Sequence, residues 1–145
     1  MPRKDPQLIR DVLEKARTIA LVGASQKTNR PSHEVMEYLQ RQGYRVIPVN
    51  PRLAGEQVLG ETAVADLASL PEPVDMAELF LAPERTDAII DQAIEQKIPA
   101  LWLQIGVINE EGARRAEAAG LKVLMDCCPK QEIPKLSIQT PAASQ

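Results

Sequence analysis

The sequence predicts an α/β fold in which a doubly wound, mainly parallel five-stranded sheet carries helices on both faces. Short aliphatic runs alternate with amphipathic stretches of helical period along the chain. This alternation is typical of parallel strands joined by right-handed crossovers. Aromatic residues make up only 3% of the 145 residues, so the core must be aliphatic. A core of this kind suits strands that are buried on both faces.

Five aliphatic runs predict the strands of this sheet. The first, TIALV, is continuously apolar, as expected of a strand in the middle of a sheet. The second, RVIPV, begins just after Gly43, a residue that favours the left-handed conformation at the end of a helix. The predicted strands cover residues 18–22, 45–49, 76–81, 100–104 and 122–125.

Apolar residues at helical spacing predict the segments between these strands. Ile9, Val12 and Leu13 mark one face of the first helix, and Asp5 can cap its start. The predicted helices cover residues 5–16, 32–42, 64–70 (a short one), 84–97 and 110–119. This order predicts a single Rossmann-like domain over residues 1–133. The segment 134–145 is rich in Pro, Ser, Ala and Gln, and we expect it to be disordered.

Composition argues against several classes of function. The net charge of −3 offers no basic surface for nucleic acid, and no apolar run approaches the ~20 residues of a membrane-spanning helix. The polar N-terminus lacks the apolar core of a signal peptide, so we expect a cytoplasmic protein. Cys127 and Cys128 are adjacent, which predicts reduced thiols and not a disulfide. His33 is the single histidine and has no partner at metal-ligand spacing.

The loop after the first predicted strand has the composition of a phosphate-binding loop. In a doubly wound sheet, ligands bind beyond the carboxyl ends of the strands, and this loop lies there. Gly23 permits a sharp turn and a close approach of the backbone to a ligand. Ser25 and Ser32 offer hydroxyl groups, while Lys27 and Arg30 offer positive charge. The following helix adds free N–H groups at its start, so the loop predicts a diphosphate site.

The end of the second predicted strand argues against NAD. Nicotinamide-binding folds place an acidic residue there to bind the ribose hydroxyls. This chain has Asn50, Pro51 and Arg52 instead, and the first loop lacks the three-glycine fingerprint of dinucleotide binders. Arg52 suits a phosphorylated ribose, as in NADP or in the 3′-phosphate of coenzyme A. Pro51 offers a flat apolar face to a purine.

Four stretches of the chain together resemble a known family. They are VGAS (22–25) followed by RPSH (30–33), GYRVIPVNP (43–51), LWLQIGV (101–107) and MDCC (125–128). In combination they resemble the stand-alone CoA-binding domain proteins, which are relatives of the N-terminal CoA-binding domain of the succinyl-CoA synthetase alpha subunit. The resemblance runs from about residue 5 to residue 132.

The resemblance implies that the ligand is coenzyme A or an acyl-CoA. It implies a pyrophosphate on the first loop, an adenosine near the Asn50 turn, and a pantetheine arm over the ends of the third and fourth strands. The expected ligand-binding residues are Gly23, Ala24, Ser25, Lys27, Arg30, Pro31, Ser32, Asn50, Pro51, Arg52, Leu81, Ala82, Pro83, Gln104 and Gly106. Cys128, near the same edge of the sheet, could form a mixed disulfide with the CoA thiol or simply be buried.

We expect a small-molecule binding or regulatory module without catalysis of its own. The chain stops after one domain, whereas the synthetase needs a second domain that carries a phosphorylated histidine and a nucleotide-grasp subunit. Two alternatives remain open. One is an NADP-linked oxidoreductase, although the chain offers no obvious Tyr-Lys or His-Asp pair. The other is a subunit that completes an acyl-CoA ligase in trans.

Overall fold

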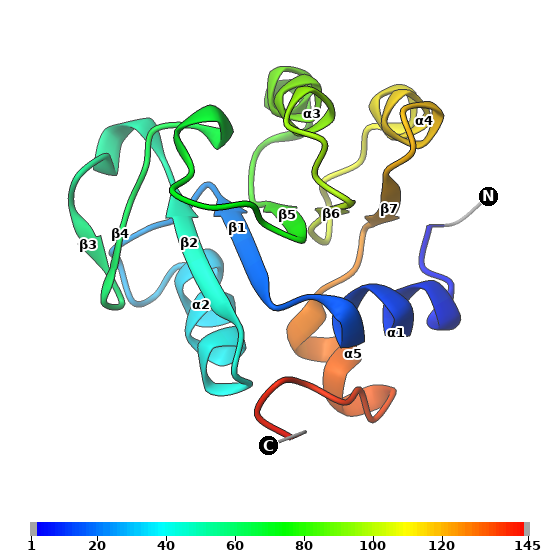
Figure 1. The fold of residues 1–145 in the computed structure, drawn as a ribbon, viewed down its shortest axis with the longest axis horizontal. Coiled ribbons are helices and arrows are strands. Elements are labelled where there is room, and N and C mark those ends of the chain that lie inside the picture. Colours follow the sequence, from blue (N-terminus) through cyan, green and yellow to red (C-terminus); the bar gives the residue numbers. More distant parts are fainter. Residues whose placement is uncertain (1–2, 144–145) are drawn as a thin grey trace.

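Five parallel strands form the central sheet of the computed structural model, which describes residues 3–143 (Figure 1). The strands are β1 (Thr18–Val22), β2 (Arg45–Val49), β5 (Met76–Leu79), β6 (Ala100–Leu103) and β7 (Lys122–Met125), in the order β2-β1-β5-β6-β7. The chain moves from β1 outward to β2 and then crosses back to β5, so the strand order reverses beside β1. The predicted doubly wound α/β fold is confirmed.

Helices cover both faces of this sheet (Figure 1). One face carries α1 (Pro6–Lys15), α2 (Pro31–Arg41) and α5 (Pro129–Lys135). The other carries α3 (Thr86–Glu95) and α4 (Glu110–Ala118). Helix α1 begins where the sequence predicts, because the Asp5 side chain accepts a hydrogen bond from the Leu8 N–H at 3.0 Å.

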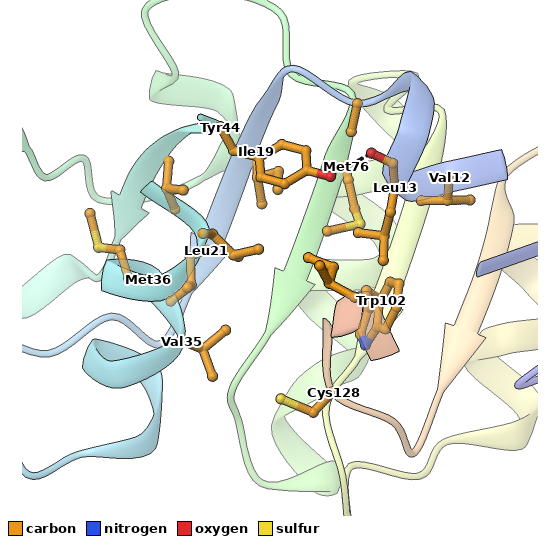
Figure 2. Close-up of a cluster of buried hydrophobic side chains, with 14 of the residues drawn as sticks. Val12, Leu13, Ile19, Leu21, Val35, Met36, Tyr44, Met76, Trp102 and Cys128 are labelled. Atoms are coloured by element: carbon orange, nitrogen blue, oxygen red, sulfur yellow. Dashed lines mark hydrogen bonds between the residues drawn. The ribbon is translucent and has the colours of Figure 1, made fainter. Parts of the chain in front are cut away.

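Aliphatic side chains fill the space between each helical layer and the sheet. On the side of α1, α2 and α5, Leu21 and Met76 from the strands pack against Leu13 and Met36 from the helices (Figure 2). Trp102 is fully buried in this layer. Its indole N–H donates to the Cys127 carbonyl at 2.8 Å, which satisfies the single polar atom of the ring.

A small antiparallel hairpin was not predicted from the sequence. It consists of β3 (Gln57–Val58) and β4 (Glu61–Thr62), and it follows a turn of 3-10 helix at Pro51–Leu53. Two-residue strands are too short to show a period of two, so no pattern could predict them. The segment predicted as a helix at 64–70 is a single 3-10 turn over Leu67–Ser69, and β5 and β6 end before residues 81 and 104.

The C-terminal segment differs from the expected disorder. Helix α5 extends to Lys135, beyond the predicted domain boundary at residue 133. Residues 136–143 then pack across α1 and the end of α2, where Ile138 is buried and the Ala142 N–H donates to the Gln42 carbonyl at 2.8 Å. The polar composition of the segment concealed this packing, because Thr140 and Pro141 are buried along with Ile138, and Thr140 Oγ1 donates a hydrogen bond to Gln42 Oε1 at 3.1 Å.

Helices long and apolar enough to cross a membrane are absent from residues 3–143.

Candidate functional site

A cavity of about 760 Å³ opens at the carboxyl ends of the parallel strands. It lies on the side of the sheet that carries α2, beside the point where the strand order reverses. The loop between β1 and α2, the turn after β2, and the segments after β5 and β6 form its walls. The lining residues are Gly23, Ala24, Ser25, Gln26, Lys27, Arg30, Pro31, Ser32, Asn50, Arg52, Leu53, Phe80, Leu81, Gln104, Ile105 and Val107.

All charged side chains in this lining are positive. Lys27, Arg30 and Arg52 contribute three cations, and no Asp or Glu is among the lining residues. None of the three cations forms a salt bridge within residues 3–143. Unpaired cations around one cavity, without a carboxylate to neutralise them, produce a positive potential that favours an anionic ligand.

Glycine is needed at position 23 for a structural reason that is independent of any ligand. Its φ is +89°, and a Cβ atom there would lie 2.1 Å from the carbonyl oxygen of Phe80. The Gly23 N–H donates to the Val49 carbonyl at 2.9 Å, which ties the loop to β2. A side chain at this position would therefore collide with the backbone that follows β5.

The rest of the loop presents its polar groups at the start of α2. The Lys27 N–H donates to Ser25 Oγ at 3.0 Å, and the Arg30 N–H donates to the Lys27 carbonyl at 3.1 Å. Arg30 occupies the N-cap position of α2 without a side-chain hydrogen bond to the first turn. The guanidinium and the positive end of the helix are thus left for an external anion.

Asn50 holds the loops together within the protein. Its Nδ2 donates to the Ala24 carbonyl at 2.8 Å, and its Oδ1 accepts from the Arg52 N–H at 2.9 Å. These contacts fix the β1 loop against the turn after β2. Arg52 is exposed at that turn. The side chain of Asn50 is therefore engaged by the protein, whereas the guanidinium of Arg52 is not.

A second cavity of about 510 Å³ continues around the same turn on the side of α3. Pro51 lines this cavity and not the first one. Gly23, Asn50, Arg52, Phe80 and Leu81 line both cavities, so the two form one crevice across the ends of β1, β2 and β5.

Three predicted residues lie outside both cavities. Ala82 and Pro83 are exposed at the start of a 3-10 turn. Gly106 has a φ of +81°, and its N–H donates to Asp126 Oδ1 at 2.8 Å. That hydrogen bond, together with Lys4, holds the pKa of Asp126 below its usual range. Gly106 therefore shapes the loop after β6 and does not form a wall.

Sequence reasoning missed five lining residues: Gln26, Leu53, Phe80, Ile105 and Val107. All five adjoin residues that were predicted, and a wider reading of the same loops would have included them. Phe80 follows a buried strand and directly precedes the predicted Leu81. Because side chains alternate between the two faces of a strand, the period of two could have identified Phe80 as a lining residue. Ile105 is 49% exposed, which is unusual for a large apolar side chain and leaves it open to a ligand.

Cysteine and histidine side chains are absent from the residues that line the two cavities. Cys127 and Cys128 are both buried, and burial raises the pKa of the Cys127 thiol to about 12. A thiol with such a pKa is a weak nucleophile. Within residues 3–143, no group of three or more His, Cys, Asp or Glu side chains is placed to hold a metal ion.

The crevice lies at the switch point of a doubly wound sheet, which is where proteins of this fold class bind their ligands. The CoA binding domain family matches residues 17–134, so this chain belongs to that family. It is 34% identical over 122 residues to the uncharacterized protein YneT of Bacillus subtilis, a match that covers 84% of this chain and 89% of YneT. The structure of cell-free ID.343 from Thermus thermophilus is 39% identical, with a TM-score of 0.87 over 91% of this chain and 98% of that chain.

The fold also occurs as part of a larger enzyme. The chain is similar to the dinucleotide-forming acetyl-coenzyme A synthetase 1 of Ca. Korarchaeum cryptofilum, with 21% identity and a TM-score of 0.67. The match covers 80% of this chain but only 27% of the synthetase. At this identity the similarity concerns the fold alone.

Proposed function

We propose that the protein binds coenzyme A or an acyl-CoA in the crevice and acts as a binding or regulatory module without catalysis of its own. The observation that carries this proposal is the first cavity, in which three unpaired cations meet no carboxylate. Coenzyme A presents a diphosphate and a 3′-phosphate, so it matches this distribution of charge. Membership of the CoA binding domain family supports the same ligand class.

The positions of the cations favour a particular orientation. Lys27 and Arg30 lie with the start of α2, where a diphosphate would meet both cations and backbone N–H groups. Arg52 lies on the other side of Asn50, at the turn that joins the two cavities, and would bind the 3′-phosphate of the adenosine. The pantetheine arm would then extend toward Leu81, Gln104 and Ile105, which supply the more apolar end of the wall.

We propose the absence of catalysis because of the residues that line the first cavity. Its lining residues include no Asp, Glu, His, Cys or Tyr, so a general acid or base other than Lys27 is not at hand. Tyr44, which an oxidoreductase could have used, is buried and donates its hydroxyl to the Leu13 carbonyl at 2.5 Å. Burial raises the pKa of Tyr44 far above its usual value.

A subunit of an acyl-CoA ligase is the second candidate. The observation that favours it is the similarity of fold to about a quarter of a synthetase. In that case the chain would hold CoA while a separate nucleotide-grasp protein supplied the chemistry. Co-purification of the untagged chain with such a protein would support this candidate.

Thermal unfolding in the presence of matched concentrations of CoA, NAD and NADP tests the proposal. Ligand at 100 times its Kd stabilises a protein by about 2.7 kcal/mol, so CoA should raise the midpoint by several degrees. NAD should not, since the turn after β2 offers its ribose no carboxylate. Equal shifts with CoA and NAD would contradict the proposal, and a larger shift with NADP than with CoA would favour an oxidoreductase.

A further inference from the structure

The chemical character of the first cavity changes from one side to the other. Its three cations all come from the segments that follow β1 and β2. The segments that follow β5 and β6 contribute no charge. Their lining residues are four apolar side chains and one neutral amide: Phe80, Leu81, Gln104, Ile105 and Val107. Because β6 lies two strands away from β1, the cationic and the apolar sides are ~10 Å apart.

The apolar side continues out of the cavity as an exposed surface. Within residues 3–143, the large apolar side chains that remain exposed are Ile105 and Ile108, each at 49%. Both belong to the loop between β6 and α4. Ile105 lines the cavity, and Ile108 directly follows the lining residue Val107. Single exposed apolar residues are common on protein surfaces, but here the two occur in one loop and at the rim of the crevice.

The protein holds this loop in a defined position. The Val107 N–H donates to the Gln104 carbonyl at 2.8 Å, and the side chain of Val107 is buried. The Gly106 N–H donates to Asp126 Oδ1 at 2.8 Å. Asn109, at the other end of the loop, caps α4 with its side chain. The residues around both isoleucines are thus fixed by hydrogen bonds and burial, while the isoleucines themselves are left facing solvent.

A ligand that covers these isoleucines must be anionic at one end and apolar at the other. The apolar surface of an isoleucine gains free energy when it is removed from water. Free CoA ends in a small thiol, which offers little apolar surface. An acyl-CoA ends in the hydrocarbon chain of its acyl group, beyond the pantetheine arm, so the order of its parts follows the order of the cavity walls from β1 to β6.

We propose that Ile105 and Ile108 form an acyl-chain subsite, and that the preferred ligand is an acyl-CoA with an apolar acyl group. This proposal rests on the proposed function, since the phosphates on Lys27 and Arg30 set the direction of the ligand. The pantetheine arm crosses Leu81 and brings the thioester to the loop after β6. The acyl chain then lies along the two isoleucines at the mouth of the crevice.

Isothermal titration with ligands of increasing chain length tests the subsite. The ligands are CoA, acetyl-CoA, butyryl-CoA and octanoyl-CoA, which carry the same phosphates and the same pantetheine arm. Affinity should rise by up to about fourfold for each methylene group that the isoleucines cover. Octanoyl-CoA should therefore bind about tenfold to a hundredfold more tightly than acetyl-CoA. The ratio of these two affinities is the readout.

Substitutions in the loop should change this ratio selectively. Ile105→Ser and Ile108→Ser should each lower it about three- to tenfold, because each removes half-exposed apolar surface from the subsite. Ile105→Leu keeps the apolar surface and should keep the ratio. Ile94→Ser is the matched control, because Ile94 is a partly buried isoleucine of α3 that lines neither cavity.

Three results would overturn the subsite. One is equal affinity of the parent for all four ligands, and another is a ratio that neither serine variant changes. The third is a dimer of the parent that Ile108→Ser dissociates, without any dependence of affinity on chain length, since the isoleucines would then form an interface between two copies. Failure of the parent to bind CoA or any of its thioesters would instead overturn the proposed function itself.

Discussion

Among single residues, Arg30 and Arg52 carry the charge at the two ends of the crevice. The Arg30 side chain makes no capping hydrogen bond to α2, and Arg52 is exposed at the turn after β2. Neither guanidinium is committed to a carboxylate within the described part of the chain. Both are therefore available to phosphates, and their separate positions allow two phosphate groups to be distinguished by substitution.

Arg30→Ala and Arg52→Ala should differ in the ligand that they affect. Each lost charge-assisted hydrogen bond should weaken CoA binding about tenfold to a hundredfold. Dephospho-CoA lacks the 3′-phosphate, so it should bind Arg52→Ala as it binds the parent and still lose affinity for Arg30→Ala. Titration calorimetry of both variants with both ligands measures this, with Arg41→Ala at the far end of α2 as the control. An equal loss of both ligands with Arg52→Ala would show that Arg52 does not bind the 3′-phosphate.

Glu78 should make stability depend on pH. Its pKa rises from an ordinary value of 4.5 to about 8 on folding, because burial disfavours the charged form. The unfolded chain therefore releases this proton first as the pH rises. The parent should lose up to about 1.4 kcal/mol of unfolding free energy for each pH unit in that window, relative to Glu78→Gln. Urea unfolding at pH 5, 7 and 9 measures the difference, which should be smallest at pH 5. A difference that stays constant with pH would contradict the buried position.

At the level of elements, a few contacts determine the position of the C-terminal segment, residues 136–143. Gln139 donates its backbone N–H to Glu14 of α1 at 2.9 Å, and Gly43 leaves room for the chain at Ala142, which a Cβ atom would approach to 2.5 Å. Gly43 thus combines a left-handed helix end, with a φ of +95°, with a close approach of two backbones. The segment acts as a strap over the ends of α1 and α2.

Ile138→Ala should lower the free energy of unfolding by about 2–4 kcal/mol, because it leaves a cavity in the layer under this strap. Chemical denaturation measures the loss. The neighbouring Gln139→Ala is the control and should stay within about 0.5 kcal/mol of the parent, since the Gln139 side chain is exposed. If the segment were disordered, neither substitution would change the free energy of unfolding.

Considered as a whole, residues 3–143 form a crevice at the switch point of the sheet, and the lining of this crevice contains no cysteine or histidine. The positive charge of that crevice contrasts with the net charge of −3 of the chain. A crevice with these properties suits an anionic ligand.

The purified chain should neither hydrolyse ATP nor join CoA to short carboxylic acids. The expectation follows from the lining of the crevice, which contains no histidine or cysteine, and from the first cavity, which contains no carboxylate. Chromatographic assay of ADP and acyl-CoA after long incubation measures both activities. Should product appear, the Arg30→Ala variant purified in the same way would separate true activity from a contaminant. Robust ligation by the parent that is lost in Arg30→Ala would contradict a non-catalytic role.

Local patterns were sufficient to predict the strands and most of the helices. Three of the five predicted strands, at 18–22, 45–49 and 122–125, have the observed bounds, since each is an apolar run that ends at a turn residue. The positions of Lys27, Arg30 and Arg52 around one cavity also follow from the sequence, because parallel strands bring their carboxyl ends to one edge.

Other features depend on contacts between distant parts of the chain, and no local pattern reports them. The β3–β4 hairpin, the packing of residues 136–143 and the place of Gly106 outside the cavity belong to this group. Glu78 is the clearest case. The sequence determined that a glutamate stands in a strand between apolar neighbours, but only the tertiary structure decided that its carboxyl is fully buried, since burial depends on the helices and strands that pack over it.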